Sequence, residues 1–143
     1  MEPEIIFKLC NAIALSGWII LLFISPFWWT ADRFIQGVII VLLAIVYTWL
    51  IALSFHPEDM NHFSSLEGVM ELFKNKYMVT AGWVHYLAFD LFTGTWIRKD
   101  AVKRNISHWQ IIPSLLLTLM LGPLGLLSYL GIRWMKTKKY FND

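Results

Sequence analysis

Four long apolar runs, separated by short polar segments, constrain the fold of this chain more than any other feature of its sequence. They cover about residues 5–25, 34–55, 77–97 and 109–132. A helix needs roughly 20 mostly apolar residues to cross the hydrocarbon core of a bilayer, and each run reaches that length. The runs therefore predict an all-α protein, a four-helix transmembrane bundle that forms a single transmembrane domain over residues 1–143.

The composition agrees with a membrane protein. Hydrophobic residues make up 57% of the chain and charged residues only 15%, whereas about a quarter of a soluble domain is charged. The net charge is +2, and the basic residues cluster at the ends of the apolar runs instead of forming one long basic segment. That placement predicts contacts with lipid headgroups and excludes nucleic acid as a partner.

The first two runs predict a tight helical hairpin, because Asp32 and Arg33 are the only charged residues between them. The chain begins with the acidic residues Glu2 and Glu4, whereas a secretory signal begins with basic residues and a transit peptide is rich in arginine. We therefore expect the first run to stay in the protein as a membrane helix. A bacterial inner membrane is the simplest location for such a chain.

The segment from His56 to Lys76 is more polar and predicts a short amphipathic helix lying on the membrane surface. Ser64 precedes Glu67 by three residues, which is the spacing of a capping box at the start of a helix. Apolar residues follow at the spacing of one helix face, namely Leu66, Val69, Met70 and Phe73. A solvated loop with a single helical turn is the alternative.

The third run separates into two arcs on a helical wheel. One arc is apolar and is expected to face lipid; it comprises Val84, Leu87, Ala88 and Leu91. The opposite arc is polar and aromatic and is expected to face the bundle; it comprises Gly82, His85, Tyr86, Phe89, Asp90 and Thr93, with Gly94 at its edge.

His85 and Asp90 are the candidate catalytic residues. Both lie within about 5 Å of the centre of the third run, at 1.5 Å of rise per residue. Ionisable side chains at that depth are costly to insert and are functional candidates by default, although a polar pair that only fastens helices together is the alternative. The two residues are about 140° apart around the helix, so we expect them to flank one groove, with Tyr86 and Phe89 between them.

The fourth run contains Pro123 next to Gly122 near its centre. Proline removes one helical hydrogen bond, so we expect a kink there, at a depth similar to that of His85 and Asp90. A re-entrant hairpin is the alternative, and it would need cover from the rest of the protein. The predicted substrate-binding residues surround this kink and offer flat surfaces to an apolar ligand: Trp83, Tyr86, Phe89, Gly122 and Pro123.

No metal site and no cofactor are expected. His56, Glu58, Asp59 and His62 are close in sequence, but their spacing matches no common set of metal ligands. Diiron desaturases and hydroxylases need repeated histidine clusters, and the chain has four histidines in total. A phosphate-binding glycine loop and a nucleophile elbow are also absent from the sequence.

The third run strongly resembles the abscisic-acid-deficient-type membrane family. The resemblance rests on His85, the run Asp90-Leu91-Phe92, and on Gly94, Trp96 and Asp100. The stretch from Leu121 to Leu127 is similar to that family, and so, more weakly, are Trp18 and Pro26. Plant members of the family are required to make neoxanthin from violaxanthin. The resemblance implies four membrane helices and carotenoid or related isoprenoid chemistry, and the short chain resembles a bacterial member.

The leading hypothesis is a membrane-embedded, isomerase-like enzyme, or an obligate component of one, that acts on a carotenoid-like apolar substrate by acid–base chemistry. A non-catalytic carotenoid-binding or assembly protein and a small proton-coupled transporter are the alternatives. The oligomeric state stays open, with a homo-oligomer among the options.

The expected topology follows from the even number of spans, which places both termini on one side. Seven basic residues then share that side against five on the other, which predicts cytoplasmic termini. The seven are Lys8, Lys74, Lys76, Arg133, Lys136, Lys138 and Lys139.

Overall fold

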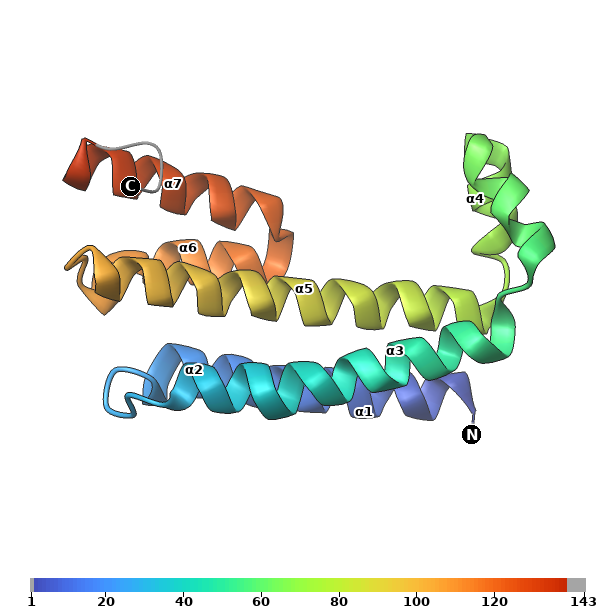
Figure 1. Ribbon diagram of the computed structural model, residues 1–143, viewed down its shortest axis with the longest axis horizontal. Helices are drawn as coiled ribbons and strands as arrows, with labels where there is room; N and C mark the ends of the chain where they lie inside the picture. The colour runs from blue at the N-terminus through green and yellow to red at the C-terminus, as the bar shows by residue number, and fades with distance from the viewer. Residues whose placement is uncertain (1, 139–143) are drawn as a thin grey trace.

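The computed structural model describes residues 2–138, which are helical throughout apart from short connections and contain no strand. The long helices lie side by side along one axis (Figure 1). Their bounds, with short π- and 3₁₀-helical pieces labelled η, are α1 Pro3–Ile19, η1 Ile20–Ile24, α2 Ala31–Phe34, η2 Ile35–Ile40, α3 Val41–Ser54, η3 Pro57–Ser64, α4 Leu66–Leu72, α5 Lys76–Lys103, α6 His108–Leu121 and α7 Pro123–Thr137.

Two helices are long and apolar enough to cross a membrane. They are Pro3–Ile24, formed by α1 and η1, and Ala31–Ser54, formed by α2, η2 and α3. The two lie antiparallel, as the sequence predicted for a helical hairpin (Figure 1). Only 39% and 22% of their apolar windows are buried inside the protein. Most of this apolar surface therefore faces outward, which indicates membrane association and not the core of a soluble protein.

Helix α5 packs against α1, α3 and α6 and forms the centre of the structure. The expected orientation of its two arcs is wrong, because Val84 and Leu91 are fully buried and Phe89 is 58% exposed. The apolar arc packs against the first two long helices. Most of the polar arc faces away from them, but Gly94 at its edge packs against Trp18 of α1. Hydropathy could not distinguish these cases, because a lipid tail and a neighbouring leucine-rich helix are equally apolar.

The fourth apolar run is not one kinked span over 109–132, and that prediction is wrong. Helices α6 and α7 fold back on each other at Gly122 and form a hairpin (Figure 1). Ser114 and Ser128 approach with their hydroxyl oxygens 2.9 Å apart, whereas 14 residues of continuous helix would separate them by about 21 Å. Pro123 lacks an N–H to continue the helical ladder, and the lack of a side chain at Gly125 lets α7 lie directly against the backbone of Thr118.

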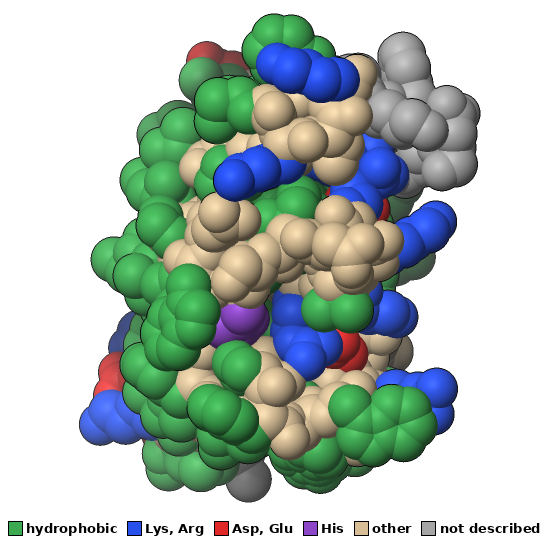
Figure 2. Space-filling view, turned by 90° about the vertical axis from the view of Figure 1, so that its left-hand side faces the viewer, with side chains coloured by type: hydrophobic (Ala, Val, Ile, Leu, Met, Phe, Trp, Pro, Cys, Tyr) green, Lys and Arg blue, Asp and Glu red, His purple; other side chains and the backbone are tan. Residues whose placement is uncertain are grey.

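The hairpin places the two ends of the described chain at opposite ends of the molecule (Figure 1), which does not support the predicted placement of both termini on one side. The N-terminal end carries six acidic residues and three basic ones; the basic ones are Lys8, Lys74 and Lys76. The opposite end carries Asp32, Asp100 and eight described basic residues: Arg33, Arg98, Lys99, Lys103, Arg104, Arg133, Lys136 and Lys138. Lys139 lies outside the described residues. Figure 2 looks onto this basic end, where Lys and Arg side chains outnumber acidic ones.

The amphipathic segment is present as η3 followed by α4, which projects from the N-terminal end of the bundle (Figure 1). The cap of α4 is Ser65, whose hydroxyl oxygen accepts the Gly68 N–H at 3.0 Å, and not Ser64 as the spacing predicted. Leu66 and Met70 on this helix are 71% and 63% exposed. These two residues of its apolar face therefore lie largely open, whereas Val69 is partly buried.

Candidate functional site

The polar face of α5 is covered along only half of its length. The α6–α7 hairpin packs on the half that contains Trp96 and Asp100, where the Tyr129 ring meets Trp96 edge-on at 5.9 Å. The other half continues past the tip of the hairpin without such cover. We call this part the open strip and define it by Val79, Gly82, Tyr86 and Phe89.

Asp90 lies where the open strip meets the tip of the hairpin. Its carboxyl group packs against Gly122 so closely that an added Cβ there would lie 3.1 Å from Asp90 Cγ and still closer to one carboxyl oxygen. The other oxygen, Oδ2, is buried and has no hydrogen-bond partner among the described residues. The structure thus brings together two residues that the sequence assigned to one site, and Pro123 begins α7 beside them.

Tyr86 connects α5 to the end of α6. Its hydroxyl donates to the carbonyl oxygens of Met120, at 3.0 Å, and Leu119, at 3.3 Å. The last carbonyls of a helix lack partners within the helix, so this hydroxyl satisfies the C-terminal end of α6 at the turn. The hydroxyl also interacts with the neighbouring Asp90 carboxyl group. Tyr86 therefore holds the tip of the hairpin directly above Asp90.

A row of aromatic rings leads from this point towards the N-terminal end. Tyr86 and Trp83 lie 5.2 Å apart between ring centroids, and Trp83 and Phe7 of α1 lie 5.4 Å apart. The indole N–H of Trp83 donates to the side-chain oxygen of Asn11 at 3.1 Å, which fixes the ring against α1. The row offers flat apolar surface along the open strip, as the sequence predicted for Trp83 and Tyr86.

His85 lies at the opposite edge of the open strip from Asp90. Its ring stacks on Phe89 at 4.5 Å and lies 5.6 Å from Tyr47 of α3, and the residue is exposed. His85 and Asp90 therefore do flank one strip of helix, with Tyr86 and Phe89 between them. That strip, however, faces outward instead of into the bundle.

Sequence reasoning missed a buried ionic cluster at the basic end. The Arg98 guanidinium donates to Asp32 Oδ2 at 2.5 Å and to the Ser25 hydroxyl at 2.7 Å, and it also donates to the Ser25 carbonyl. Arg98 and Asp32 are 8% and 6% exposed, so the expectation that Arg98 contacts headgroups is wrong. One signal was available in the sequence. Asp32 immediately precedes the second apolar run and Arg98 immediately follows the third, so antiparallel helices place both residues at the same end of the bundle. Their contacts fasten the turn after η1 to α5.

Asp100 is the centre of a second buried cluster, which fastens the hairpin. It accepts the Tyr129 hydroxyl at 2.6 Å and the Arg104 guanidinium at 3.0 Å, and Arg133 of α7 lies 3.6 Å away. Arg133 is 3% exposed, so the headgroup contact expected for it is wrong as well. Several residues that carried the family resemblance, among them Trp96 and Asp100, thus hold the fold together.

In the polar segment His56–His62, the side chain of Asp59 lies between two histidines. Asp59 lies 3.7 Å from His56 and 3.7 Å from His62, and its carboxylate accepts the His56 backbone N–H at 2.7 Å. Across residues 2–138, no group of three or more such side chains has the geometry to hold a metal ion. This segment therefore contributes a helix cap and no candidate ligand set.

Comparison with known proteins identifies the sequence group. The family model described as ABA DEFICIENT 4-like matches residues 5–129. A curated relative, the chloroplastic protein ABA DEFICIENT 4 of Arabidopsis thaliana, is 27% identical over 96 residues, which is 62% of this chain and 42% of that protein. The chain thus matches less than half of the length of this relative. No solved structure matches.

Proposed function

Because the chain belongs to the ABA DEFICIENT 4-like family, we propose that it is a membrane-embedded enzyme, or an obligate component of one, that acts on a carotenoid or related isoprenoid lipid. The carotenoid-derived substrate class follows from what the family resemblance implies. The isomerase-like, acid–base character is our own proposal and derives from the chemistry of the open strip.

The observation that carries the proposal is the placement of Asp90. Its carboxyl group has a buried oxygen without a hydrogen-bond partner in the described part of the chain, and it lies at the inner end of the aromatic open strip. The strip faces outward on a protein whose long helices carry many other exposed apolar side chains. A substrate dissolved in the bilayer can therefore reach Asp90 sideways, with its flat conjugated chain against Trp83 and Tyr86.

The proposed chemistry is an isomerisation. A general acid protonates the oxygen of an epoxide as its C–O bond breaks, while a base removes a proton from a neighbouring carbon and a new double bond forms. Atoms and electrons balance without an oxidant, since one proton is added and one is removed. His85 and Asp90 would divide these roles from the two edges of the strip, about 7.5 Å apart along the helix axis.

The membrane arrangement that supports this chemistry has three crossings and a re-entrant hairpin. Helix α5 has 28 residues, or about 42 Å of length, which is enough for the third crossing. Helices α6 and α7 enter from the basic end and turn back at Gly122, with α5 covering the turn. Irregular backbone at such a depth is tolerated only where protein covers it.

The activity test uses a host that makes an epoxy-carotenoid, with product measured by chromatography and normalised to folded protein. Asp90→Asn keeps the shape that packs under Gly122 and removes the acid–base group, so we expect at least a 100-fold loss of turnover. Phe92→Leu is the matched control, because Phe92 is an exposed residue of the same helix. This variant should keep full activity. Equal activities of the two variants would refute the catalytic role of Asp90.

A non-catalytic binding protein is the second candidate, and the contacts of Tyr86 with Leu119 and Met120 favour it, because they show polar groups being used to fasten the hairpin. On that reading Asp90→Asn retains bound pigment and the host's conversion of the substrate is unchanged. Turnover by the purified wild-type protein alone would exclude this candidate.

The topology follows from the distribution of charge. The basic end carries eight described Lys and Arg residues against three at the other end, so the positive-inside rule places the basic end, with the end of α7, in the cytoplasm. The start of α1 then lies on the opposite side. In a bacterial inner membrane, a C-terminal fluorescent fusion should be active and an N-terminal one inactive; two active fusions would contradict three crossings.

A further inference from the structure

A cleft of about 470 Å³ lies at the N-terminal end of the molecule, between the start of α1, the end of α4 and the start of α5. Its volume falls in the range of ligand-binding sites. The inner walls are apolar and include Phe7, Phe73 and Val79. Phe73 also packs over the open strip, since a Cβ added to Gly82 would lie 3.0 Å from its ring.

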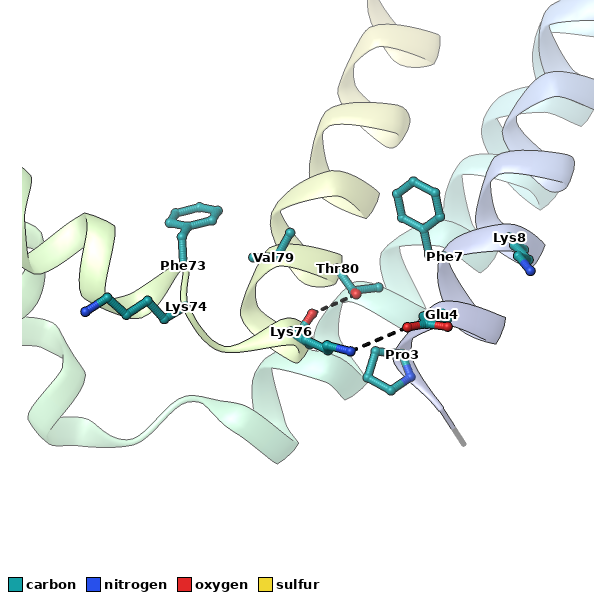
Figure 3. A pocket seen from close by; sticks show the side chains of 9 residues that line it. All are labelled: Pro3, Glu4, Phe7, Lys8, Phe73, Lys74, Lys76, Val79 and Thr80. Carbon is teal, nitrogen blue, oxygen red and sulfur yellow. Dashed lines mark hydrogen bonds and ion pairs between the residues drawn. The ribbon is translucent and has the colours of Figure 1, made fainter.

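The rim of this cleft is charged. Figure 3 shows the rings of Phe7 and Phe73 on the side of the cleft towards the bundle, with Lys76 and Glu4 below them at the end of the helices. Lys8 and Lys74 lie on the two sides of the same opening, with their ammonium groups directed away from it (Figure 3). The cleft therefore changes from apolar to charged along the helix axis, with Glu4 and three lysines at its rim. A membrane lipid changes from acyl chain to headgroup in the same direction.

The lysines at this end of the molecule are concentrated around the cleft. The end carries six acidic residues, and its only described Lys or Arg residues are the three that line the cleft. Two of them have exposed partners, with Lys74 at 2.6 Å from Glu71 and Lys76 at 3.4 Å from Glu4. Such exposed ion pairs contribute little stability, so a bound anion can replace either carboxylate at small cost.

We propose that this cleft binds one anionic phospholipid, with its phosphate at Lys76 and an acyl chain against Phe7 and Val79. The exposed side chains of Lys8 and Lys74 turn towards the phosphate from the two sides. The lipid covers the end of the open strip near Val79, which the hairpin does not reach. It also packs under the end of α4 near Phe73, and so holds this amphipathic helix at the bilayer surface. This site is separate from Asp90, and binding there does not depend on the proposed catalytic activity.

The test is native mass spectrometry of the purified full chain in detergent, with phosphatidylglycerol or phosphatidylcholine added. We expect one phosphatidylglycerol to bind at least 10-fold more tightly than phosphatidylcholine. The triple variant Lys8→Gln/Lys74→Gln/Lys76→Gln should lose that preference. Lys99→Gln/Lys103→Gln/Lys136→Gln removes the same charge from the basic end and should keep it.

A second variant tests the cleft itself. Val79→Trp fills the space and leaves every charge in place, so the tightly bound phosphatidylglycerol should be lost while the helical circular dichroism is unchanged. Asp90→Asn should bind the lipid like the wild type, which separates this result from the activity test. Equal binding of the two lipids, an equal loss in the two lysine triples, or unchanged binding by Val79→Trp would each overturn the proposal.

Discussion

The two halves of α5 use the same kinds of residue for different purposes. Ten residues separate Asp90 from Asp100, and both lie on the face that turns away from α1 and α3. Asp100 is surrounded by the Tyr129 hydroxyl, Arg104 and Arg133, all within 3.6 Å. Asp90 has a buried oxygen that finds no hydrogen-bond partner within residues 2–138, and it lies beside a strip that the hairpin leaves uncovered.

The difference teaches that a polar residue in a membrane helix has to be interpreted from its neighbours. A carboxylate whose oxygens accept hydrogen bonds from neighbouring side chains stabilises the fold, so replacing it lowers stability. A carboxylate with one oxygen that accepts no hydrogen bond can still accept a proton or bind another group. The comparison between Asp100 and Asp90 can therefore be tested by measuring stability and activity separately.

The largest effect on stability is expected for Asp100→Ala. It removes the acceptor shared by Tyr129 and the arginines, and breaking a buried ion pair on one side costs about 3–5 kcal/mol. The free energy of unfolding, from titration of the purified protein with a denaturing detergent, measures it. Glu4→Gln, which breaks the exposed contact with Lys76, is the control and should change nothing measurable. Similar losses in both variants would contradict the structural role of Asp100.

A smaller loss is expected when the hairpin is pushed apart. In Gly125→Ala the added methyl group would overlap the backbone and hydroxyl of Thr118, and overpacking of this kind typically costs about 1–3 kcal/mol. Gly131→Ala lies on the same helix with nothing within 4 Å of its added Cβ, so it should be neutral or slightly stabilising. If both variants unfold alike, α6 and α7 do not pack as described.

Asp90→Asn should change stability least among the buried sites, by less than about 1 kcal/mol, since the amide keeps the shape under Gly122 and can also form hydrogen bonds. Its effect on turnover should nevertheless be the largest of all. The same denaturation titration, run beside the activity assay, checks both statements. If Asp90→Asn lost as much stability as Asp100→Ala, Asp90 would be a structural residue like Asp100, and the proposed difference between the two halves of α5 would be contradicted.

The smallest effect concerns the segment at the far end of the open strip. Phe73→Glu removes the ring that packs over Gly82 and places a charge at the cleft. Helix α4 should therefore detach more often from α5 and from the bilayer surface. Limited proteolysis of protein in vesicles should then cut sooner between His56 and Lys76, with little change in overall stability. Glu67→Gln, on the polar side of the same helix, should be cut at the wild-type rate.

Much of the fold could be predicted from the sequence, because it depends on local properties. The positions of the apolar runs, the first helical hairpin and the amphipathic segment follow from length and hydrophobic spacing. The expected outward orientation of Val84 and Leu91 was wrong for a physical reason: burial against α1 and burial in lipid remove the same apolar area from water. Periodicity divides a membrane helix into faces but does not say which face meets protein.

The site was predicted in part. The wheel correctly separated His85 from Asp90 and placed Tyr86 and Phe89 between them. Gly122 and Pro123 marked a break, but a kink and a reversal share that sequence signal, and the contact of Ser114 with Ser128 exists only in the reversal. The pairing of Asp32 with Arg98 joins residues 66 positions apart, a separation over which helical spacing carries no information.

The reversal at Gly122 also has a consequence for biogenesis. Helices α6 and α7 have 14 and 15 residues, or about 21 and 23 Å, so neither can cross a hydrocarbon core about 30 Å thick by itself. In the proposed arrangement of three crossings, we expect insertion to proceed in order, with the first three long helices in place before the hairpin enters. Helix α5, against which the hairpin packs, is already synthesised at that point, since Tyr86 and Asp100 emerge from the ribosome before α6 begins. Assembly of this protein is thus directional along the chain, with α5 acting as the template for everything that follows it.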